Sequence, residues 1–399
     1  MTAALRDLSR RTDIASRQRP GTPFATRLFR FNWLVLALGL LISAIGIFNQ
    51  HVVSLHTSDD FVRSQFVRLG VAILCFLLVS LIDVRLLRRL SFLGVLAALG
   101  LLILVPILGV EYNESRRWIP IAGFTLQPSE IAQVALIVFL AAYLDGRSHA
   151  QMGNPLWLIP PWALISVTAY LIFNQPDLGT TFKLVALMGL MTLCANVRWS
   201  FIIITLLLVG ATVTAIYQWP ERFLKPYQVD RLTCFQLTDA QIEQLADTSP
   251  CDQPRQARIA IGGAGVWGHG ALNAPQLESL IIYEPYNDMI LAVHAEQFGL
   301  VGTLALLVLV ALTVFIGFVV AFFCRSQFTR LMALGAALNF GLYATINVMM
   351  VLSLLPVVGM PFALLSQGGT VTVFTWISLG LINNAWINRH LVFFGEDEG

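Results

Sequence analysis

An aspartate, Asp288, stands where a long polar segment gives way to an apolar one, a position well suited to chemistry. Small residues follow it at helical spacing: Ala292, Ala295, Gly299 and Gly302. At about 100° per residue these lie within about 40° of Asp288 on one helical face. The pattern predicts a carboxylate above a shallow groove, which suits a substrate with a polar head and an apolar tail. The alternative is an ordinary helix start followed by a small-residue packing face.

Two neighbouring arginines, Arg116 and Arg117, precede Trp118. Guanidinium groups match phosphate oxygens well, so the two could form an anion-binding pair. They could equally be long side chains that anchor the end of a membrane span. The sequence leaves both interpretations open.

Two further carboxylates stand at expected helix starts. Ser129 is a fair N-cap, and Glu130 then falls in the first turn, where the helix dipole favours an acid. Asp177 follows Pro176 and is itself a good turn and N-cap residue. Capping alone explains both acids, and substrate binding is the alternative.

Lys183 lies inside an apolar run, six residues beyond Asp177. A charge at that depth costs several kcal/mol unless it is paired or hydrated. We therefore expect Lys183 to form an ion pair, either structural or functional. Snorkelling of the side chain to the membrane surface is the alternative.

Several other chemistries find no support in the sequence. Five glycines between residues 262 and 270 superficially resemble a phosphate loop, but the lysine and the strand–helix context of that motif are missing. The six histidines show no zinc spacing, and a net charge of +2 gives no case for nucleic-acid binding. We expect no nucleotide or organic cofactor.

The composition predicts an all-α, polytopic integral membrane protein. The chain is 57% hydrophobic and 12% charged, whereas soluble domains carry about 25% charged residues. A span needs about 20 apolar residues, so the run 130–144 is the weakest of ten. The run 288–323 is too long for one crossing, and we divide it into an interfacial piece (288–299) and a span (300–323). The ten apolar runs are 31–49, 65–82, 91–109, 130–144, 156–173, 178–197, 199–217, 288–323, 331–352 and 370–388.

The distribution of arginine predicts the orientation. With the N-terminus in the cytoplasm, fifteen of the 25 basic residues fall on cytoplasmic segments, as the positive-inside rule requires. Both termini are then cytoplasmic, as an Arg-rich tail (1–30) and an acidic tail (391–399). A single membrane domain (31–390) lies between them, and its large loop (218–287) lies outside.

Cys234 and Cys251 both fall in this outer loop, and an oxidising compartment makes a disulfide between them plausible. It would contribute about 3 kcal/mol by restricting the unfolded chain. Two free thiols are the alternative, because the sequence does not show the geometry. Cys75, Cys194 and Cys324 lie in or beside spans and are expected to be packing residues.

Four motifs in order resemble the SEDS family of bacterial cell-wall proteins (RodA, FtsW and SpoVE), and the resemblance covers about residues 30–390. Ile259–Gly262 and Ala295–Gly299 are more similar to the elongation type, RodA, than to the division type. The motifs are Arg116-Arg117-Trp118 with Gln127-Pro128-Ser129-Glu130, then Gln175-Pro176-Asp177-Leu178-Gly179-Thr180, then 256–302, then Leu354-Leu355-Pro356 through Ser366-Gln367-Gly368-Gly369.

The resemblance implies a peptidoglycan glycosyltransferase that polymerises lipid II, an undecaprenyl-pyrophosphate-linked disaccharide-pentapeptide, outside the bacterial cytoplasmic membrane. The implied partner is a class B penicillin-binding protein, which crosslinks the strands within the cell-wall synthesis complex. The family's essential acid matches Asp288, which inherits the catalytic role. Candidate substrate-binding residues are Arg116, Arg117, Glu130, Asp177, Lys183, Glu284, Glu296 and Ser366.

The chain departs from the family pattern at several positions. The family usually has lysine at Gln133, and tyrosine and serine at Gln367 and Thr370. The loop insert with the two cysteines is also unusual. We propose that Lys183 replaces the missing lysine, as a buried cation that holds pyrophosphate or balances Glu130. The departures leave open a divergent member with reduced or altered activity.

In the expected mechanism Asp288 acts as general base on a GlcNAc 4-hydroxyl, or holds a divalent cation (Mg²⁺ or Mn²⁺) that activates it. Arg116 and Arg117 would stabilise the leaving pyrophosphate. The alternatives are a division-type polymerase, a transporter of lipid-linked precursors, and a non-catalytic scaffold. A transporter predicts polar residues through the full membrane depth, whereas the polar motifs here are predicted on the outer side.

Overall fold

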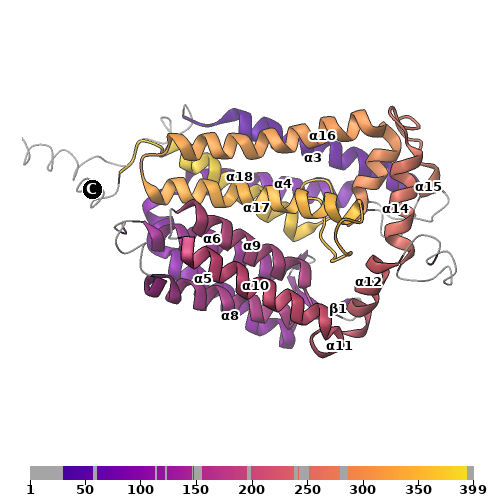
Figure 1. Ribbon diagram of the computed structural model, residues 1–399. Helices are drawn as coiled ribbons and strands as arrows, with labels where there is room; N and C mark the ends of the chain where they lie inside the picture. The colour runs from indigo at the N-terminus through magenta and orange to yellow at the C-terminus, as the bar shows by residue number, and fades with distance from the viewer. Residues whose placement is uncertain are drawn as a thin grey trace, which may run out of the picture.

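The computed structural model describes residues 30–56, 61–112, 115–121, 124–145, 147, 155–195, 199–237, 241, 251–278 and 286–392. Residues 1–29 and 393–399, and with them nearly all of both predicted tails, lie outside the described residues. The described chain is predominantly helical, and its long helices lie side by side along one direction (Figure 1). The predicted all-α polytopic membrane fold is therefore confirmed.

Each of the ten apolar runs forms a helix, because a segment without water must satisfy its backbone groups internally. Seven of the described helices are long and apolar enough to cross a membrane, while α6, α9 and residues 203–218 of α10 are shorter apolar helices. The ten are α3 (Trp33–His56), α4 (Phe61–Leu81), α5 (Val84–Leu108), α6 (Pro128–Leu144), α8 (Ile159–Phe173), α9 (Leu178–Cys194), α10 (Trp199–Gln218), α16 (Ile290–Phe323), α17 (Gln327–Val351) and α18 (Gly369–Ile387).

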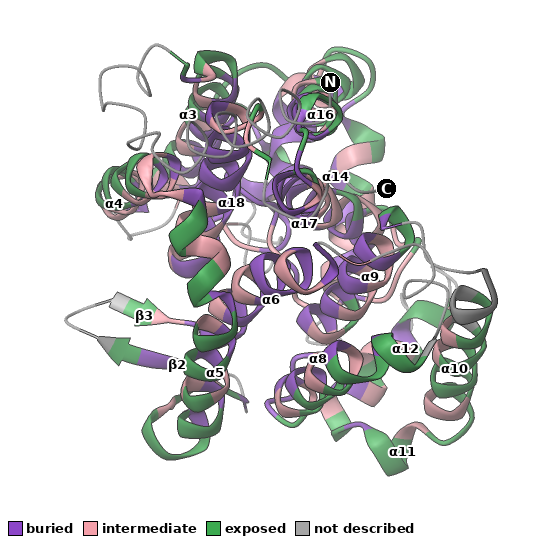
Figure 2. Ribbon diagram, turned by 90° about the vertical axis from the view of Figure 1, so that its left-hand side faces the viewer, coloured by how far each residue is buried: buried purple, intermediate pink, exposed green. Residues whose placement is uncertain are grey.

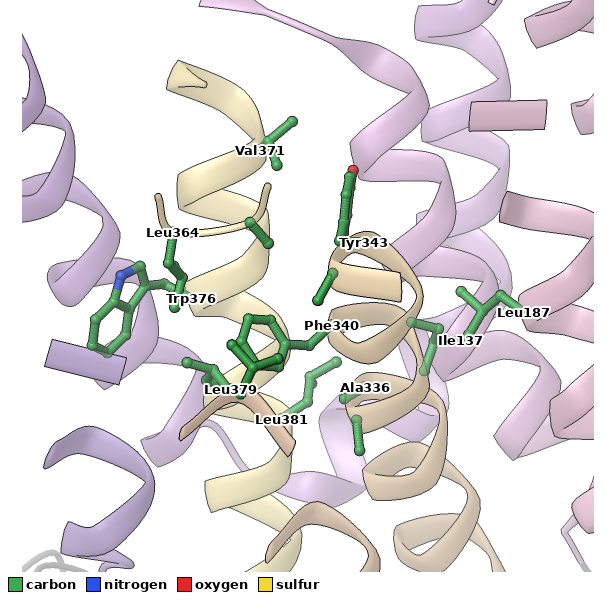
Figure 3. Close-up of a cluster of buried hydrophobic side chains, with 14 of the residues drawn as sticks. Ile137, Leu187, Ala336, Phe340, Tyr343, Leu364, Val371, Trp376, Leu379 and Leu381 are labelled. Carbon is green, nitrogen blue, oxygen red and sulfur yellow. The ribbon is translucent and has the colours of Figure 1, made fainter. Parts of the chain in front are cut away.

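Helices α17 and α18 form the centre of the bundle. In an end-on view their buried residues face inward, while α4, α5 and α10 carry exposed residues on the periphery (Figure 2). The most apolar stretch of α18 is 78% buried, against 22% in α4 and α5. Figure 3 shows the packing inside, with Phe340 of α17 near Leu379 and Leu381 of α18. The peripheral faces are apolar and exposed, as expected for helices that face lipid.

Among the described residues, four short helices gather at one end of the bundle, which we call the loop end (Figure 1). They are α11 (Pro220–Phe223), α12 (Pro226–Gln236), α14 (Asp252–Gly263) and α15 (Pro275–Glu278). A disulfide between Cys234 and Cys251, with Cα atoms 5.0 Å apart, joins α12 to the start of α14. The 3₁₀ helix η1 (Pro155–Leu158) directly precedes α8.

A small antiparallel sheet, which the sequence did not lead us to expect, connects α5 to α6. Its strands are β1 (Val110–Tyr112), β2 (Ser115–Ile121) and β3 (Phe124–Leu126), in the order β1-β2-β3. A register shift follows Val110, so Glu111 pairs with Arg116. Strands of three to seven residues are too short to give a clear alternating pattern, which is why the sequence did not reveal them.

Helix α16 is broken at Gly299, which has φ 62° and ψ −162°. The glycine-rich turn after α14 inserts there: Leu300 and Val301 donate to the carbonyls of Gly265 and Val266 at 3.1 Å. In return His269 and Gly270 donate at 3.0 Å to the carbonyls of residues 296 and 297. The backbone groups freed by the break are thus paired with the loop. The break lies at the boundary expected between the interfacial piece and the span.

Candidate active site at the loop end

Asp288 lies at the loop end, two residues before α16, and is only 6% exposed. Its backbone carbonyl accepts a hydrogen bond from Asn347 Nδ2 of α17 at 2.8 Å. The same amide donates to the Met360 carbonyl at 2.7 Å. One buried amide therefore ties Asp288 to both α17 and the segment that leads into α18.

The two residues before Asp288 are held as firmly. Ser366 Oγ donates to the Asn287 carbonyl at 2.6 Å and accepts from the Phe362 amide at 2.8 Å. The Tyr286 carbonyl accepts from Gln50 Nε2 at 2.9 Å and from the amide of residue 367 at 2.8 Å. Ser366 therefore positions the chain at Asp288, a contact that the sequence motif alone did not specify.

The Asp288 carboxylate and a guanidinium group both lie beside Gly359. A Cβ atom built on Gly359 would lie 3.6 Å from Asp288 Oδ2 and 3.7 Å from Arg231 Nη1. Gly359 has φ 73°, a conformation that glycine adopts without strain. Arg231 comes from α12, and its Nη1 also donates to the Val357 carbonyl at 3.4 Å. The sequence gave no signal for Arg231, because it reaches this place only through the docking of the loop.

The predicted groove of small residues below Asp288 is absent, so that expectation is wrong. Ala292 is 0% and Ala295 2% exposed. Gly299 packs against the backbone of the glycine-rich turn, and the space above Gly302 is filled by Phe298. Asp288 also precedes the helix, and the break at Gly299 changes the helical phase beyond it. These small residues instead form a packing face, which was the alternative interpretation of their spacing.

Glu296 has a structural contact in place of the expected substrate contact. Its side chain is 1% exposed, and Oε1 accepts from the Gln276 amide at 2.7 Å. It therefore fastens α15 to α16. Glu284, the other upstream candidate acid, lies outside the described residues.

A second buried cluster surrounds Glu130. Lys183 Nζ lies 4.0 Å from Glu130 Oε2, and the lysine side chain is 0% exposed. Gln133 Nε2 donates to Glu130 Oε1 at 3.3 Å, and Lys183 Nζ lies 2.9 Å from the ring centroid of Tyr343. The ammonium group faces inward, so the structure has the ion pair and not the snorkelling alternative. Figure 3 shows Tyr343 at the edge of the apolar core that surrounds Phe340.

Asp177 forms the adjoining part of this cluster. Its Oδ1 accepts from the Thr180 amide at 3.1 Å, the expected N-cap of α9. Its Oδ2 accepts from Gln127 Nε2 at 3.0 Å, and Arg117 Nη1 lies 3.8 Å from Oδ1. Arg117 also donates to the carbonyls of Gln175, at 3.2 Å, and Pro176. Two acidic side chains, Glu130 and Asp177, thus lie beside two basic ones, Lys183 and Arg117, inside the bundle near the loop end.

Two local expectations at these residues are wrong. Arg116 and Arg117 do not form a pair, because neighbouring strand residues point to opposite faces. Arg116 is about half exposed and binds Glu111 at 3.1 Å, whereas Arg117 faces Asp177. The N-cap of α6 is Gln127 and not Ser129, since Pro128 already occupies the first helical position. Glu130 lies in the first turn as expected.

Comparison with known proteins places this fold and site. Residues 26–391 match the family described as cell cycle protein, FtsW, RodA and SpoVE. The curated relatives include "Probable peptidoglycan glycosyltransferase FtsW" of Halothiobacillus neapolitanus, 31% identical over 71% of this chain and 66% of that protein. They also include "Peptidoglycan glycosyltransferase MrdB" of Escherichia coli, 31% identical over 73% of this chain and 76% of that protein. The match thus spans just under two thirds of the former relative and about three quarters of the latter.

Solved structures of similar fold agree. A chain from a study titled "Structural coordination of polymerization and crosslinking by a peptidoglycan synthase complex" superposes with a TM-score of 0.75 and 25% identity, over 91% of this chain and 99% of that one. The rod shape determining protein RodA of Thermus thermophilus superposes with a TM-score of 0.67 and 24% identity, over 91% and 98%. The fold and site define a polytopic membrane protein with buried acids at one end. The chain belongs to the FtsW, RodA and SpoVE family, also called SEDS.

Proposed function

We propose that this protein polymerises lipid II into glycan strands, with Asp288 as the catalytic residue. It is an enzyme of the peptidoglycan glycosyltransferase class, the activity that its curated relatives carry in their names. The observation that carries the assignment of the site is that the Asp288 carboxylate and the Arg231 guanidinium group both lie beside Gly359. An acid that can take a proton and a cation that can stabilise an anion lie together at one end of the membrane domain.

The loop end is proposed to be the outer face of the bacterial cytoplasmic membrane. Fifteen of the 25 basic residues fall on segments that lead to the opposite end, as the positive-inside rule requires of the cytoplasmic side. The 218–287 loop carries eight acids and five bases, which is compatible with translocation. In this orientation both termini are cytoplasmic, and Asp288 meets lipid-linked substrate outside.

The proposed step is attack of an acceptor GlcNAc 4-hydroxyl on the anomeric carbon of the donor. Asp288 accepts the hydroxyl proton while the bond from the anomeric carbon to the pyrophosphate oxygen breaks, and undecaprenyl pyrophosphate leaves with the electron pair. The bonds from Asn347 and Ser366 fix the backbone at residues 287 and 288. A base held in this way needs little reorganisation before reaction.

A divalent cation at Asp288 would need oxygen ligands from the substrate. The part of the chain that the structure describes contains no group of three or more His, Cys, Asp and Glu side chains able to hold a metal. A single carboxylate with pyrophosphate oxygens and water is a donor set that Mg²⁺ accepts, and Asp288 would be the residue that holds such an ion. We derive no step through a metal, and we propose that Asp288 acts as the base.

The Glu130–Lys183 pair is proposed to shape the site in place of the lysine that relatives have at Gln133. The pair lies where α6, α9 and α17 meet. Asp177 adds to the negative potential at the Lys183 ammonium group. Lys183 acts here as a positioning residue.

Buried polar residues extend along α18, among them Thr375, Ser378 and Asn383, so the expected confinement of polar residues to one side is wrong. The position of the acidic and lysine side chains still favours an enzyme over a transporter. In the described part of the chain the buried Asp, Glu, Lys and Arg residues are Glu130, Asp145, Asp177, Lys183, Asp288 and Glu296. Asp145 lies at the C-terminal end of α6, where it pairs with Arg88 at 2.5 Å, and the others belong to the loop end. A continuous charged path through the bundle, which a transporter of a pyrophosphate-linked precursor would use, is not formed by these residues.

The partner is proposed to be a class B penicillin-binding protein that crosslinks the strands, in a complex serving cell elongation. Support comes from the structural relative studied in a complex that couples polymerization to crosslinking. The motifs Ile259–Gly262 and Ala295–Gly299 favour the elongation type. Relatives named FtsW and MrdB match about equally well, so a division role is the second candidate.

The proposal is tested with purified protein and its crosslinking partner in vesicles that hold lipid II in both leaflets. Polymerisation predicts glycan strands of many disaccharides, made from the leaflet that faces the loop end. A transporter would move lipid II between leaflets without forming strands. A scaffold would do neither, and either of these two results would overturn the proposal.

A further inference from the structure

Three arginines lie at the end of the bundle opposite the loop end, where α3 begins and where α16 and α18 end (Figure 1). Arg30 lies three residues before α3, Arg325 two residues after α16, and Arg389 two residues after α18. We call these three residues the arginine cluster. Its charges come from the ends of three different helices, at the depth where a membrane span meets the membrane surface.

Hydrogen bonds hold the three helix ends together. The Asn32 amide donates to Asn383 Oδ1 at 2.8 Å, which ties the start of α3 to α18. The Arg325 amide donates to the Arg389 carbonyl at 2.9 Å, which ties the chain after α16 to the chain after α18. The backbone beside each arginine of the cluster is therefore held in place by contacts that do not involve the guanidinium groups.

The arginine cluster has no acidic partner within the part of the chain that the structure describes. None of its three members forms an ion pair with a described aspartate or glutamate. At the same end of the bundle Arg88 does have such a partner, because it pairs with Asp145. The cluster therefore gathers like charges where a neighbouring arginine is balanced by a carboxylate.

The charges of the cluster act on one another and on a shared neighbour. Partial burial, and after it the charge of Arg30, lowers the pKa of Arg389. Partial burial also lowers the pKa of His390, followed by the charges of Arg389, Arg325 and Arg30. Both shifts have the same direction, so a further positive charge is disfavoured at this place and a negative charge is favoured.

Aromatic side chains lie on the helices that carry the cluster. The Arg389 guanidinium group lies 4.1 Å from the centroid of the Trp386 ring, and its Nη1 donates to the Trp386 carbonyl at 2.9 Å. Trp33 is 58%, Phe322 81% and Phe323 55% exposed, at the start of α3 and the end of α16. Exposed rings at the ends of membrane spans are typical of the headgroup region. An anion that contacts both the arginines and these rings would carry apolar chains.

We propose that the arginine cluster binds the headgroup of an anionic phospholipid from the membrane leaflet at this end of the bundle. Guanidinium groups bind phosphate oxygens through charge-assisted hydrogen bonds, and the exposed rings contact the acyl chains. The lipid phosphate lessens the repulsion between the three like charges and so joins the ends of α3, α16 and α18. The proposal does not rest on the proposed function, because it requires only that this end lies at a membrane surface.

The acidic tail is the competing occupant of the cluster. Glu396, Asp397 and Glu398 follow Arg389 closely in the sequence and lie outside the described residues. The lipid is favoured because all three arginines lie within two or three residues of a span end. Phospholipid phosphates lie at that depth, and anionic leaflets attract basic residues placed there.

The test counts the lipids bound to the full-length protein in a neutral detergent by native mass spectrometry. The probes are phosphatidylglycerol and phosphatidylcholine with identical acyl chains, so that they differ only in the headgroup. The first phosphatidylglycerol is expected to bind at least about tenfold more tightly than phosphatidylcholine. Arg30→Gln and Arg325→Gln should each weaken phosphatidylglycerol binding about fivefold and leave phosphatidylcholine binding unchanged. The matched control is Arg89→Gln, an exposed arginine of α5, which lies away from α3 and α16 (Figure 2) and should bind lipid as the wild type does.

Equal binding of the two lipids would overturn the proposal, and this comparison uses the wild type alone, so it stands even if a variant fails to fold. An equal loss in Arg89→Gln would show a diffuse attraction to the whole basic end and no defined site. Displacement of phosphatidylglycerol by inorganic phosphate would make the ligand a free anion. Phosphatidylglycerol binding that appears only in the triple variant Glu396→Gln, Asp397→Asn and Glu398→Gln would assign the cluster to the acidic tail. Polymerisation is not measured, so each of these results bears on the arginine cluster alone.

Discussion

Replacement of Lys183 by methionine should destabilise the protein by about 3–5 kcal/mol. Methionine fills most of the space of the lysine stem but removes the ammonium group, which lies 4.0 Å from Glu130 Oε2 and 2.9 Å from the ring centroid of Tyr343. Two unit charges at this distance attract by about 4 kcal/mol at an effective dielectric constant of about 20. The change leaves the Glu130 carboxylate, 2% exposed, without its cation.

The assay is thermal unfolding of the purified variant in detergent, read together with polymerisation at equal folded amount. Lys225→Met is the matched control, because Lys225 is the only other lysine in the chain and is exposed in the outer loop. The control should unfold at nearly the wild-type temperature. Lys183→Met should unfold well below it and lose activity.

A second substitution separates the ion pair from simple packing. Gln133 Nε2 already lies 3.3 Å from Glu130 Oε1, so a lysine at 133 can place its ammonium group beside the same carboxylate. Gln133→Lys added to Lys183→Met should recover most of the lost stability and activity. If Lys183→Met unfolds and polymerises as the wild type does, the pair contributes nothing and the reasoning is refuted.

Three further changes test the parts that hold Asp288 and the loop. Gly299→Ala should lower the free energy of unfolding by at least about 3 kcal/mol, because the alanine Cβ would lie 2.3 Å from the Gly268 nitrogen. A variant as thermally stable as the wild type would contradict the account of the break in α16. Ser366→Ala removes one buried and one partly buried hydrogen bond. It should lower the free energy of unfolding by about 1–3 kcal/mol and reduce turnover, whereas unchanged turnover would show that Ser366 is not a positioning residue. Joint replacement of Cys234 and Cys251 by alanine should lower the stability of the loop by about 3 kcal/mol. Proteolysis of residues 218–287 should then be faster than in the wild type. Equal rates of cleavage would contradict a stabilising role of the disulfide.

The membrane fold could be predicted from the sequence because a segment that crosses the lipid must be apolar along its whole length. Ten apolar runs became ten helices, and the excess length of 288–323 revealed the break at Gly299. The sheet between Val110 and Leu126 was missed, since its short strands carry too few residues to show alternation.

The site was less accessible to sequence reasoning, because its contacts join segments far apart in the chain. A lysine inside an apolar run must have a partner, so the ion pair of Lys183 could be anticipated. Nothing local distinguishes Arg231 from the other basic residues of the loop, and only the docking of α12 against residues 357–359 places it near Asp288. Similarly, helical spacing suggested a groove below Asp288, but spacing along one helix does not reveal what packs against it.

Comparison of lipid II polymerisation by wild type and Asp288→Asn tests the central claim most directly. Both proteins are assayed with the crosslinking partner at equal folded amount, since asparagine keeps the size of the side chain and the backbone bond from Asn347. The account predicts glycan strands from the wild type and a loss of at least about a hundredfold in the variant, the scale of general base catalysis. Equal strand synthesis by the two proteins would show that Asp288 is not the base and would contradict the account.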